Sequence, residues 1–198
     1  MLELLEYFQK GGMVMYPLLA CSVIALGIFI ERLVYYNKAL GDEAIHEKLY
    51  NYMDAGEQEA AYNIAAGGDS SVCELLQYYS GLTQERNTRI QTLETKVSMM
   101  MSMYEDKLHI LNTIVTLAPL LGLLGTILGI ISSFSIFSVS ADQPFAITAG
   151  IGEALIATGF GIVVAVFALV LHELLELKIT RLDSQIEFCA LKIVESGK

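Results

Sequence analysis

Three long stretches without a charged residue constrain this chain more than any other feature of its sequence. They cover residues 11–30, 110–141 and 154–171. A helix needs about 20 apolar residues to cross a hydrocarbon core of about 30 Å. The charged fraction is only 17%, against about 25% in soluble domains. The sequence therefore predicts an all-α membrane protein with three transmembrane helices.

The positions of the lysines and arginines predict how the chain is oriented. The expected segments are an N-terminus at 1–12, transmembrane helices at 13–35, 110–138 and 145–172, a helical loop at 36–109, a hairpin at 139–144 and a helical tail at 173–198. All Lys and Arg residues except Lys10 lie at the end of the first span or in the loop and the tail. The positive-inside rule makes that side cytoplasmic, so the N-terminus and the hairpin are expected to be periplasmic. The first stretch could instead be a signal peptide, but Glu3 and Glu6 precede it and no small-x-small cleavage site follows.

Apolar stripes of helical period run through the loop and the tail. Such residues recur every three or four positions from about Thr88 to Leu111, with no helix breaker, and again from Leu175 to Ile193. We expect the second and third transmembrane helices to continue as long cytoplasmic helices, the third over about 50 residues or roughly 75 Å. The stripes either pack in a bundle, which is the commoner use, or bind an outside partner. Ser71-Val72-Cys73-Glu74 fits a capping box at the start of a shorter helix.

Small residues line one face of the second and third expected transmembrane helices. The helix-packing positions that we single out are Gly122, Gly125, Gly129, Ala157 and Gly161. Small residues let helix backbones approach closely in lipid. Two such faces in a three-helix chain indicate contact between copies. Pro119 removes one backbone hydrogen bond and is expected to kink the second helix.

Glu153 is an acidic residue within the third expected span. It follows Pro144 by nine residues, or about 13 Å of helix. A carboxylate at that depth costs at least about 2.5–3.5 kcal/mol, and such residues usually mark ion paths. If the helix begins later, Glu153 lies at the outer interface instead. Thr126 and Thr158 are further polar groups in the spans, although threonine hydroxyls often bond to their own helix.

Other classes of function have little support. A net charge of −10 argues against nucleic-acid binding. The chain has no GxxxxGK[ST] motif for ATP, and its three cysteines form no CxxC pair. The segment from His172 to Glu176 lacks the second histidine of the HExxH zinc motif, which leaves a membrane metalloenzyme as a remote alternative. We expect no catalytic residue, no metal and no cofactor apart from protons as the coupling ion.

Two motifs in the apolar stretches resemble those of a known family. APLLGLLGTILGI, at 118–130, resembles the second-helix motif of the MotA/TolQ/ExbB proton-channel family. GIGEALIAT, at 150–158 and followed by Gly161, resembles the third-helix motif of its ExbB and TolQ branch. Glu31-Arg32-Leu33 matches the usual end of the first helix. Phe167 stands where those proteins usually have proline, and His172-Glu173 where they have Tyr-Asn, so we expect a straighter lower third helix and a different proton exit.

The resemblance implies an inner-membrane homopentamer around a pore. Two single-span ExbD- or TolR-like helices, each with an Asp, would lie inside it. Proton flow would move the pentamer against these helices and pass work to a TonB- or TolA-like protein. Glu153, Thr126 and Thr158 correspond to the pore-lining polar residues of the family. The alternative is a non-conducting oligomeric scaffold that only holds a partner protein in the membrane lipid.

Overall fold

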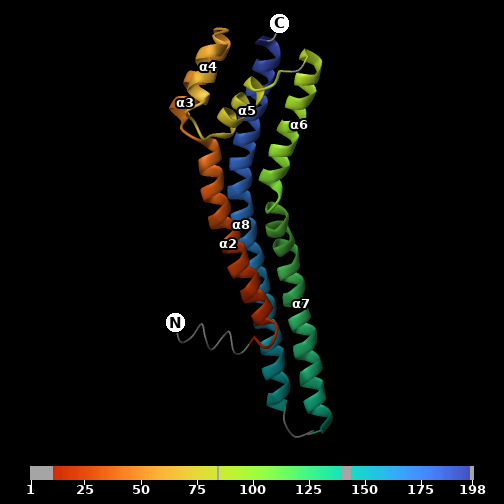
Figure 1. The fold of residues 1–198 in the computed structure, drawn as a ribbon. Coiled ribbons are helices and arrows are strands. Elements are labelled where there is room, and N and C mark those ends of the chain that lie inside the picture. Colours follow the sequence, from red (N-terminus) through yellow and green to blue (C-terminus); the bar gives the residue numbers. More distant parts are fainter. Residues whose placement is uncertain (1–10, 84, 140–143, 197–198) are drawn as a thin grey trace. The chain divides into compact units, whose positions relative to one another are not determined.

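The structure, a computed structural model, describes residues 11–83, 85–139 and 144–196, without the side chains of 135–139, 144–149 and 196. Most of the expected N-terminal segment and hairpin lies outside the described residues. All described elements are helices, as the sequence predicts (Figure 1). They are α2 (Met15–Leu40), α3 (Glu43–Asp54), α4 (Gln58–Ala65), α5 (Ser71–Ser80), α6 (Arg86–Glu105), α7 (Leu108–Val139) and α8 (Pro144–Ser196).

Three helical stretches, built on α2, α7 and α8, are long and apolar enough to cross a membrane. Each contains an 18-residue apolar window, and only 28%, 28% and 39% of these windows is buried inside the chain. Exposed apolar surface of that extent needs another apolar environment, which lipid or other helices provide. The prediction of a multi-pass membrane protein with three candidate spans is therefore confirmed.

The chain divides into two compact units, of which the first is the apolar one. It combines the described residues up to Phe29 with Leu108–Glu173. Its helices pack through small side chains, because alanines fill much of its interior. The buried alanines are Ala25, Ala118, Ala154, Ala157, Ala165 and Ala168. Short side chains bring the helix axes close together, as expected for helices that associate in lipid.

The second unit combines Ile30–Lys107 with the chain from Leu174 onward. The stripe predicted in the tail forms part of its core, since all six side chains are buried: Leu175, Ile179, Leu182, Ile186, Cys189 and Ile193. α8 continues without interruption for 53 residues, or about 80 Å. The prediction of a long third helix is thus confirmed, and the helix also continues through Phe167.

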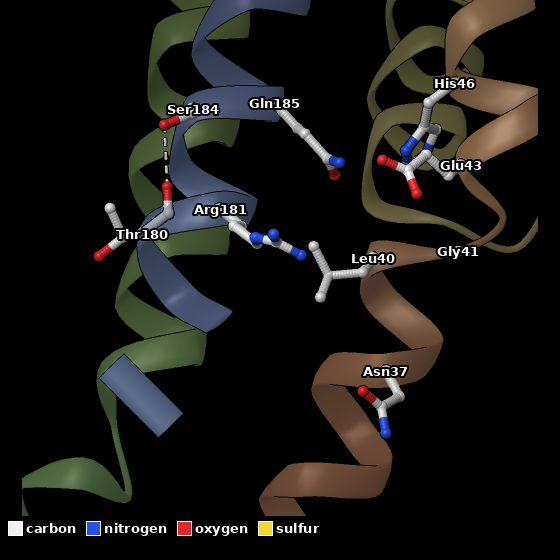
Figure 2. Close-up of a pocket in the computed structure, with 9 residues that line it drawn as sticks. All are labelled: Asn37, Leu40, Gly41, Glu43, His46, Thr180, Arg181, Ser184 and Gln185. Carbon is white, nitrogen blue, oxygen red and sulfur yellow. Dashed lines mark hydrogen bonds between the residues drawn. The ribbon is translucent and has the colours of Figure 1, made fainter. Parts of the chain in front are cut away.

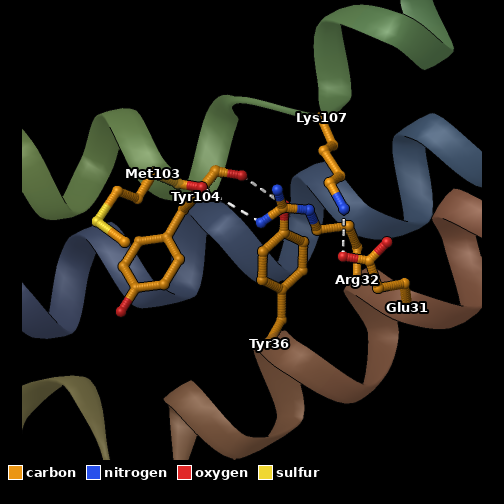
Figure 3. Close-up of polar contacts among 6 residues, drawn as sticks. All are labelled: Glu31, Arg32, Tyr36, Met103, Tyr104 and Lys107. Atoms are coloured by element: carbon orange, nitrogen blue, oxygen red, sulfur yellow. Dashed lines mark hydrogen bonds and ion pairs between the residues drawn. The ribbon is translucent and has the colours of Figure 1, made fainter.

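The second span continues as a long helical stretch over Arg86–Phe134, as predicted, but two residues interrupt that stretch before the span. α6 ends at Glu105 and α7 begins at Leu108. Side chains of α2 donate hydrogen bonds to the carbonyl oxygens of Met103 and Tyr104 at this point (Figure 3). These are the carbonyls that a continuous helix would need for its next two backbone bonds.

The start of α5 also differs from the prediction, by one residue. The side chain of Ser70, not Ser71, caps the helix and accepts a hydrogen bond from the Cys73 amide at 3.4 Å. Ser71 is the first helical residue, and its hydroxyl donates to the Ala39 carbonyl at 3.0 Å. It also lies 2.6 Å from the Tyr104 hydroxyl. Two adjacent serines make the local capping pattern ambiguous, and these tertiary bonds of Ser71 decide it.

Candidate functional site

Glu153 lies on the third turn of α8 and is the only charged residue between Pro144 and Leu171. Its side chain is exposed in the first unit, and its carboxylate lies against Gly12, just before α2. A side-chain carbon at position 12 would collide with Oε1 of Glu153. Gly12 also has a φ of 72°, which other residues rarely adopt. The carboxylate is the end of a flexible side chain and can move, so the positive φ is what favours glycine at position 12.

The contact between Ala154 and Gly129 shows how far Glu153 lies from the ends of α7 and α8. The next residue, Ala154, packs on Gly129 of α7, where an added Cβ would lie 3.0 Å from the Ala154 Cβ. Gly129 precedes the end of α7 at Val139 by ten residues, or about 15 Å of helix. Glu153 follows the start of α8 by nine residues, or about 13 Å. Both helices therefore continue for two to three apolar turns beyond the carboxylate.

The predicted packing residues lie at close contacts between α7 and α8. An added Cβ at Gly161 would lie 2.7 Å from the Ala118 carbonyl oxygen, and one at Gly122 would lie 3.1 Å from the Ala157 carbonyl oxygen. An added Cβ at Gly125 would lie 2.6 Å from the Ala157 Cβ. These approaches leave no room for a larger side chain at the three glycines. Pro119 lies inside α7, and the helix continues through it.

The two threonines make different hydrogen bonds. Thr126 donates to the Leu123 carbonyl of its own helix at 2.6 Å, while Thr158 donates across to the Gly122 carbonyl of α7 at 3.1 Å. A threonine hydroxyl has one proton and two lone pairs. Because both protons are held by carbonyls, these hydroxyls can accept a hydrogen bond without losing the bonds that they make. Their role in a proton pathway stays a prediction.

The sequence pattern of the MotA/TolQ/ExbB proton channel family matches residues 69–188, more than half of the chain. The chain belongs to the MotA/TolQ/ExbB proton channel family. The biopolymer transport protein ExbB-like 1 of Synechocystis sp. is 35% identical over 186 residues, which covers 87% of this chain and 70% of that protein. Members of the MotA/TolQ/ExbB family are proton channels and not enzymes. The matched region includes Thr126, Glu153 and Thr158.

This MotA/TolQ/ExbB family member also has a cavity in its second unit, of about 510 Å³ (Figure 2). Glu43 and Arg181 contribute opposite charges to its lining. His46, also in the lining, is buried, and its Nε2 lies 3.0 Å from the Ser70 hydroxyl. Burial lowers the pKa of His46, although the charges of Asp42 and Glu43 oppose this shift. The mixed charge favours neither an anion nor a cation, so charge alone defines no ligand class.

Two groups of contacts in this MotA/TolQ/ExbB family member have little signal in its sequence. The close approach of Gly12 to Glu153 has only a weak one, a glycine before an apolar helix. Arg32 and Tyr36 form the second group, since both are buried and bind carbonyls of α6. An arginine at the end of a span does not by itself indicate which distant carbonyl it binds.

Proposed function

We propose that this chain is the pore-forming subunit of a proton-driven motor in a cell inner membrane. Copies assemble as a homopentamer around a single-span ExbD- or TolR-like partner. Proton passage at Glu153 then drives mechanical work on a TonB- or TolA-like protein, in support of outer-membrane transport or envelope integrity. The N-terminus is periplasmic and the C-terminus cytoplasmic, which the distribution of Lys and Arg supports.

The exposed carboxylate of Glu153 is the observation that carries this proposal. It projects from an apolar helix, and among the described residues no Lys or Arg forms an ion pair with it. A charge facing lipid near the bilayer centre costs at least about 2.5–3.5 kcal/mol. A neighbouring copy, a partner helix or water in a pore removes that cost. Moving each proton charge across 100 mV then releases about 2.3 kcal/mol.

The surface of α8 supports assembly of several copies. Gly152 and Gly159 are seven residues apart, and an added Cβ at either would meet no atom within 4 Å. They therefore leave a shallow small-residue surface on the same face of the helix, of the kind that accepts another helix in lipid. Leu155 and Val163 nearby are 66% and 63% exposed. Contact with a second copy would bury them.

The need for a partner follows from the count of acidic groups. Glu153 is the only acidic residue in the three expected spans apart from Glu31, at the cytoplasmic end of the first. Proton transfer through the membrane needs a second group that takes up the proton. A single-span partner with an intramembrane Asp would provide it. Thr126 and Thr158 would accept hydrogen bonds along the path, in keeping with the bonds that they make.

Replacement of Glu153 by glutamine tests the proposal. The chain would be co-purified with its single-span partner, reconstituted in vesicles, and assayed for proton uptake with a pH-sensitive dye under an imposed potential. E153Q should still bind the partner but lose proton uptake, because the glutamine side chain cannot take up and release a proton near neutral pH. The matched control is E187Q, which removes an exposed carboxylate of α8 in the tail, outside the expected spans, and should conduct like the wild type.

Four results would argue against this function. Proton uptake by E153Q at the wild-type rate would reject Glu153 as the proton-binding group. Equal loss in E153Q and E187Q would indicate a general effect of charge. A wild-type complex that holds its partner but conducts no protons would favour the non-conducting scaffold, and uptake of sodium in place of protons would change the coupling ion.

A further inference from the structure

The cavity of the second unit has two buried polar atoms in its lining that make no hydrogen bond. They are Nδ1 of His46 on α3 and Oε1 of Gln185 on α8. Only four buried side-chain atoms lack a partner in the described part of the chain, and two of them lie at this one cavity. All residues of the lining belong to the second unit, so the site does not depend on how the two units are placed.

His46 offers a ligand its Nδ1 atom. The side chain is 2% exposed, and Nε2 already lies 3.0 Å from the Ser70 hydroxyl. Because burial lowers the pKa of His46, the imidazole is neutral near neutral pH and carries one proton. Nδ1 therefore offers either an N–H donor or a lone pair, depending on which nitrogen holds that proton. A carboxamide or a hydroxyl of a ligand suits both cases, since each contains a donor and an acceptor.

Gln185 reaches the cavity from the other side. Figure 2 shows the side chains of Gln185 and Arg181 extending from α8 toward the end of α2 and the start of α3. Oε1 of Gln185 is buried and accepts no hydrogen bond from any described residue. A buried acceptor without a donor is costly, so a ligand that brings an N–H or O–H group to this atom gains a hydrogen bond at little cost to the fold.

Two opposite charges lie at the cavity on separate helices. Glu43 of α3 and Arg181 of α8 are both exposed, and neither forms an ion pair with another described residue. A ligand with a single charge would be attracted by one of these groups and repelled by the other. A zwitterion can place its carboxylate at the guanidinium of Arg181 and its ammonium at the carboxylate of Glu43. The lining thus suits both charges on one small molecule.

We propose that this cavity binds a small zwitterion that also carries a carboxamide or a hydroxyl, which is the chemistry of a polar α-amino acid. Its charged groups bind Arg181 and Glu43, and its polar side chain binds Gln185 and His46. The volume of about 510 Å³ lies within the range of small-molecule sites, about 300–1,000 Å³. The proposal does not depend on the proton-driven function, and binding can be measured on the chain alone.

Titration of the full chain in detergent micelles with L-glutamine, L-asparagine and L-serine, followed by ligand-observed NMR, tests the site. At least one of the three should bind saturably. The amide of the tightest binder lacks the carboxylate, and its N-acetyl derivative lacks the ammonium. Each derivative should bind at least about tenfold more weakly, as expected for the loss of a charge-assisted hydrogen bond.

Variants of the lining assign each contact. R181Q should bind the parent amino acid and its amide equally, and E43Q should bind the parent and its N-acetyl derivative equally, because the protein partner of the missing group is gone. Both positions are exposed, so the variants should fold. E47Q is the matched control, since Glu47 is an exposed residue of α3 outside the lining, and should bind like the wild type.

Q185M tests the polar side-chain contact. It should weaken binding of the parent amino acid without lowering the melting temperature, because Oε1 of Gln185 makes no hydrogen bond among the described residues. Wild-type affinity in Q185M would reject the polar amino acid as the ligand.

Three other results would overturn the site. The first is the absence of saturable binding of all three amino acids at millimolar concentrations. The second is equal affinity of the wild type for the parent and both derivatives. The third is unchanged binding in R181Q and E43Q, or a loss in E47Q as large as in E43Q, because the molecule would then bind elsewhere or respond only to total charge.

Discussion

Gly161→Ala is expected to weaken the contact between α7 and α8 in the membrane unit. The new Cβ would lie 2.7 Å from the Ala118 carbonyl oxygen and 3.0 Å from the Gly122 Cα. Both are backbone atoms, which cannot move aside as the end of a flexible side chain can. Ordinary contacts begin near 3.4 Å, so the two helices must separate locally by roughly half an ångström.

The size of the effect follows from two contributions. Overpacking of a close interface costs about 1–3 kcal/mol. The separation also lengthens the hydrogen bond from Thr158 to Gly122, which is 3.1 Å in the structure, and bonds of this kind between membrane helices average about 0.6 kcal/mol. The higher helix propensity of alanine offsets up to about 1 kcal/mol of these two costs, so the expected net loss in the free energy of unfolding is about 1–3 kcal/mol. Gly159→Ala is the matched control, since an added Cβ there meets nothing within 4 Å.

Unfolding in mixed micelles with a rising fraction of SDS, followed by circular dichroism, measures this difference. G159A should be as stable as the wild type or more stable by up to about 1 kcal/mol, because alanine favours a helix over glycine. G161A at wild-type stability would refute the close backbone contact. Equal destabilisation by G159A would show instead that any side chain on this part of α8 is unfavourable.

Two further predictions concern the second unit. Burial lowers the pKa of His46 in the folded chain, so the unfolded chain binds a proton at this histidine more readily. The folded chain is therefore not destabilised by His46 above about pH 6.5, and it loses stability as the pH falls below that value. A thermal melt from pH 7.5 to 5 should show this slope in the wild type and in H109Q but not in H46Q. Cys73 and Cys189 are buried, and burial raises the pKa of the Cys189 thiol to about 12, so neither should react with a maleimide at pH 7.5 until the chain unfolds. A cysteine at the exposed position Glu59 should then report the orientation, and its labelling from the periplasmic side alone would contradict a cytoplasmic loop.

The elements that could be predicted from the sequence are those that repeat over a whole helix. The three apolar stretches and the stripe from Leu175 to Ile193 each contain many residues with one period, so no single exception changes the result. α8 accordingly has nearly the predicted length, and its six stripe residues are buried. The motifs around Glu153 likewise placed the chain in the family that the matched region then showed.

Features set by single contacts could not be predicted. Ser70 and Ser71 are equally good caps by local chemistry, and the distant partners of Ser71, the Ala39 carbonyl and the Tyr104 hydroxyl, decide between them. The position of Gly12 against Glu153 joins residues more than a hundred positions apart. Periodicity carries no information about such pairs.

The composition and period of this sequence by themselves determined an all-helical membrane chain with one acidic group in its third span. Only the tertiary structure decided where the second long helix stops. The helix-forming pattern from Thr88 to Leu111 is intact, so local propensity favours continuation. The helix is nevertheless interrupted between Glu105 and Leu108, at the turn where Arg32 and Tyr36 of α2, separated from their acceptors by 71 and 68 residues, bind the carbonyls of Met103 and Tyr104.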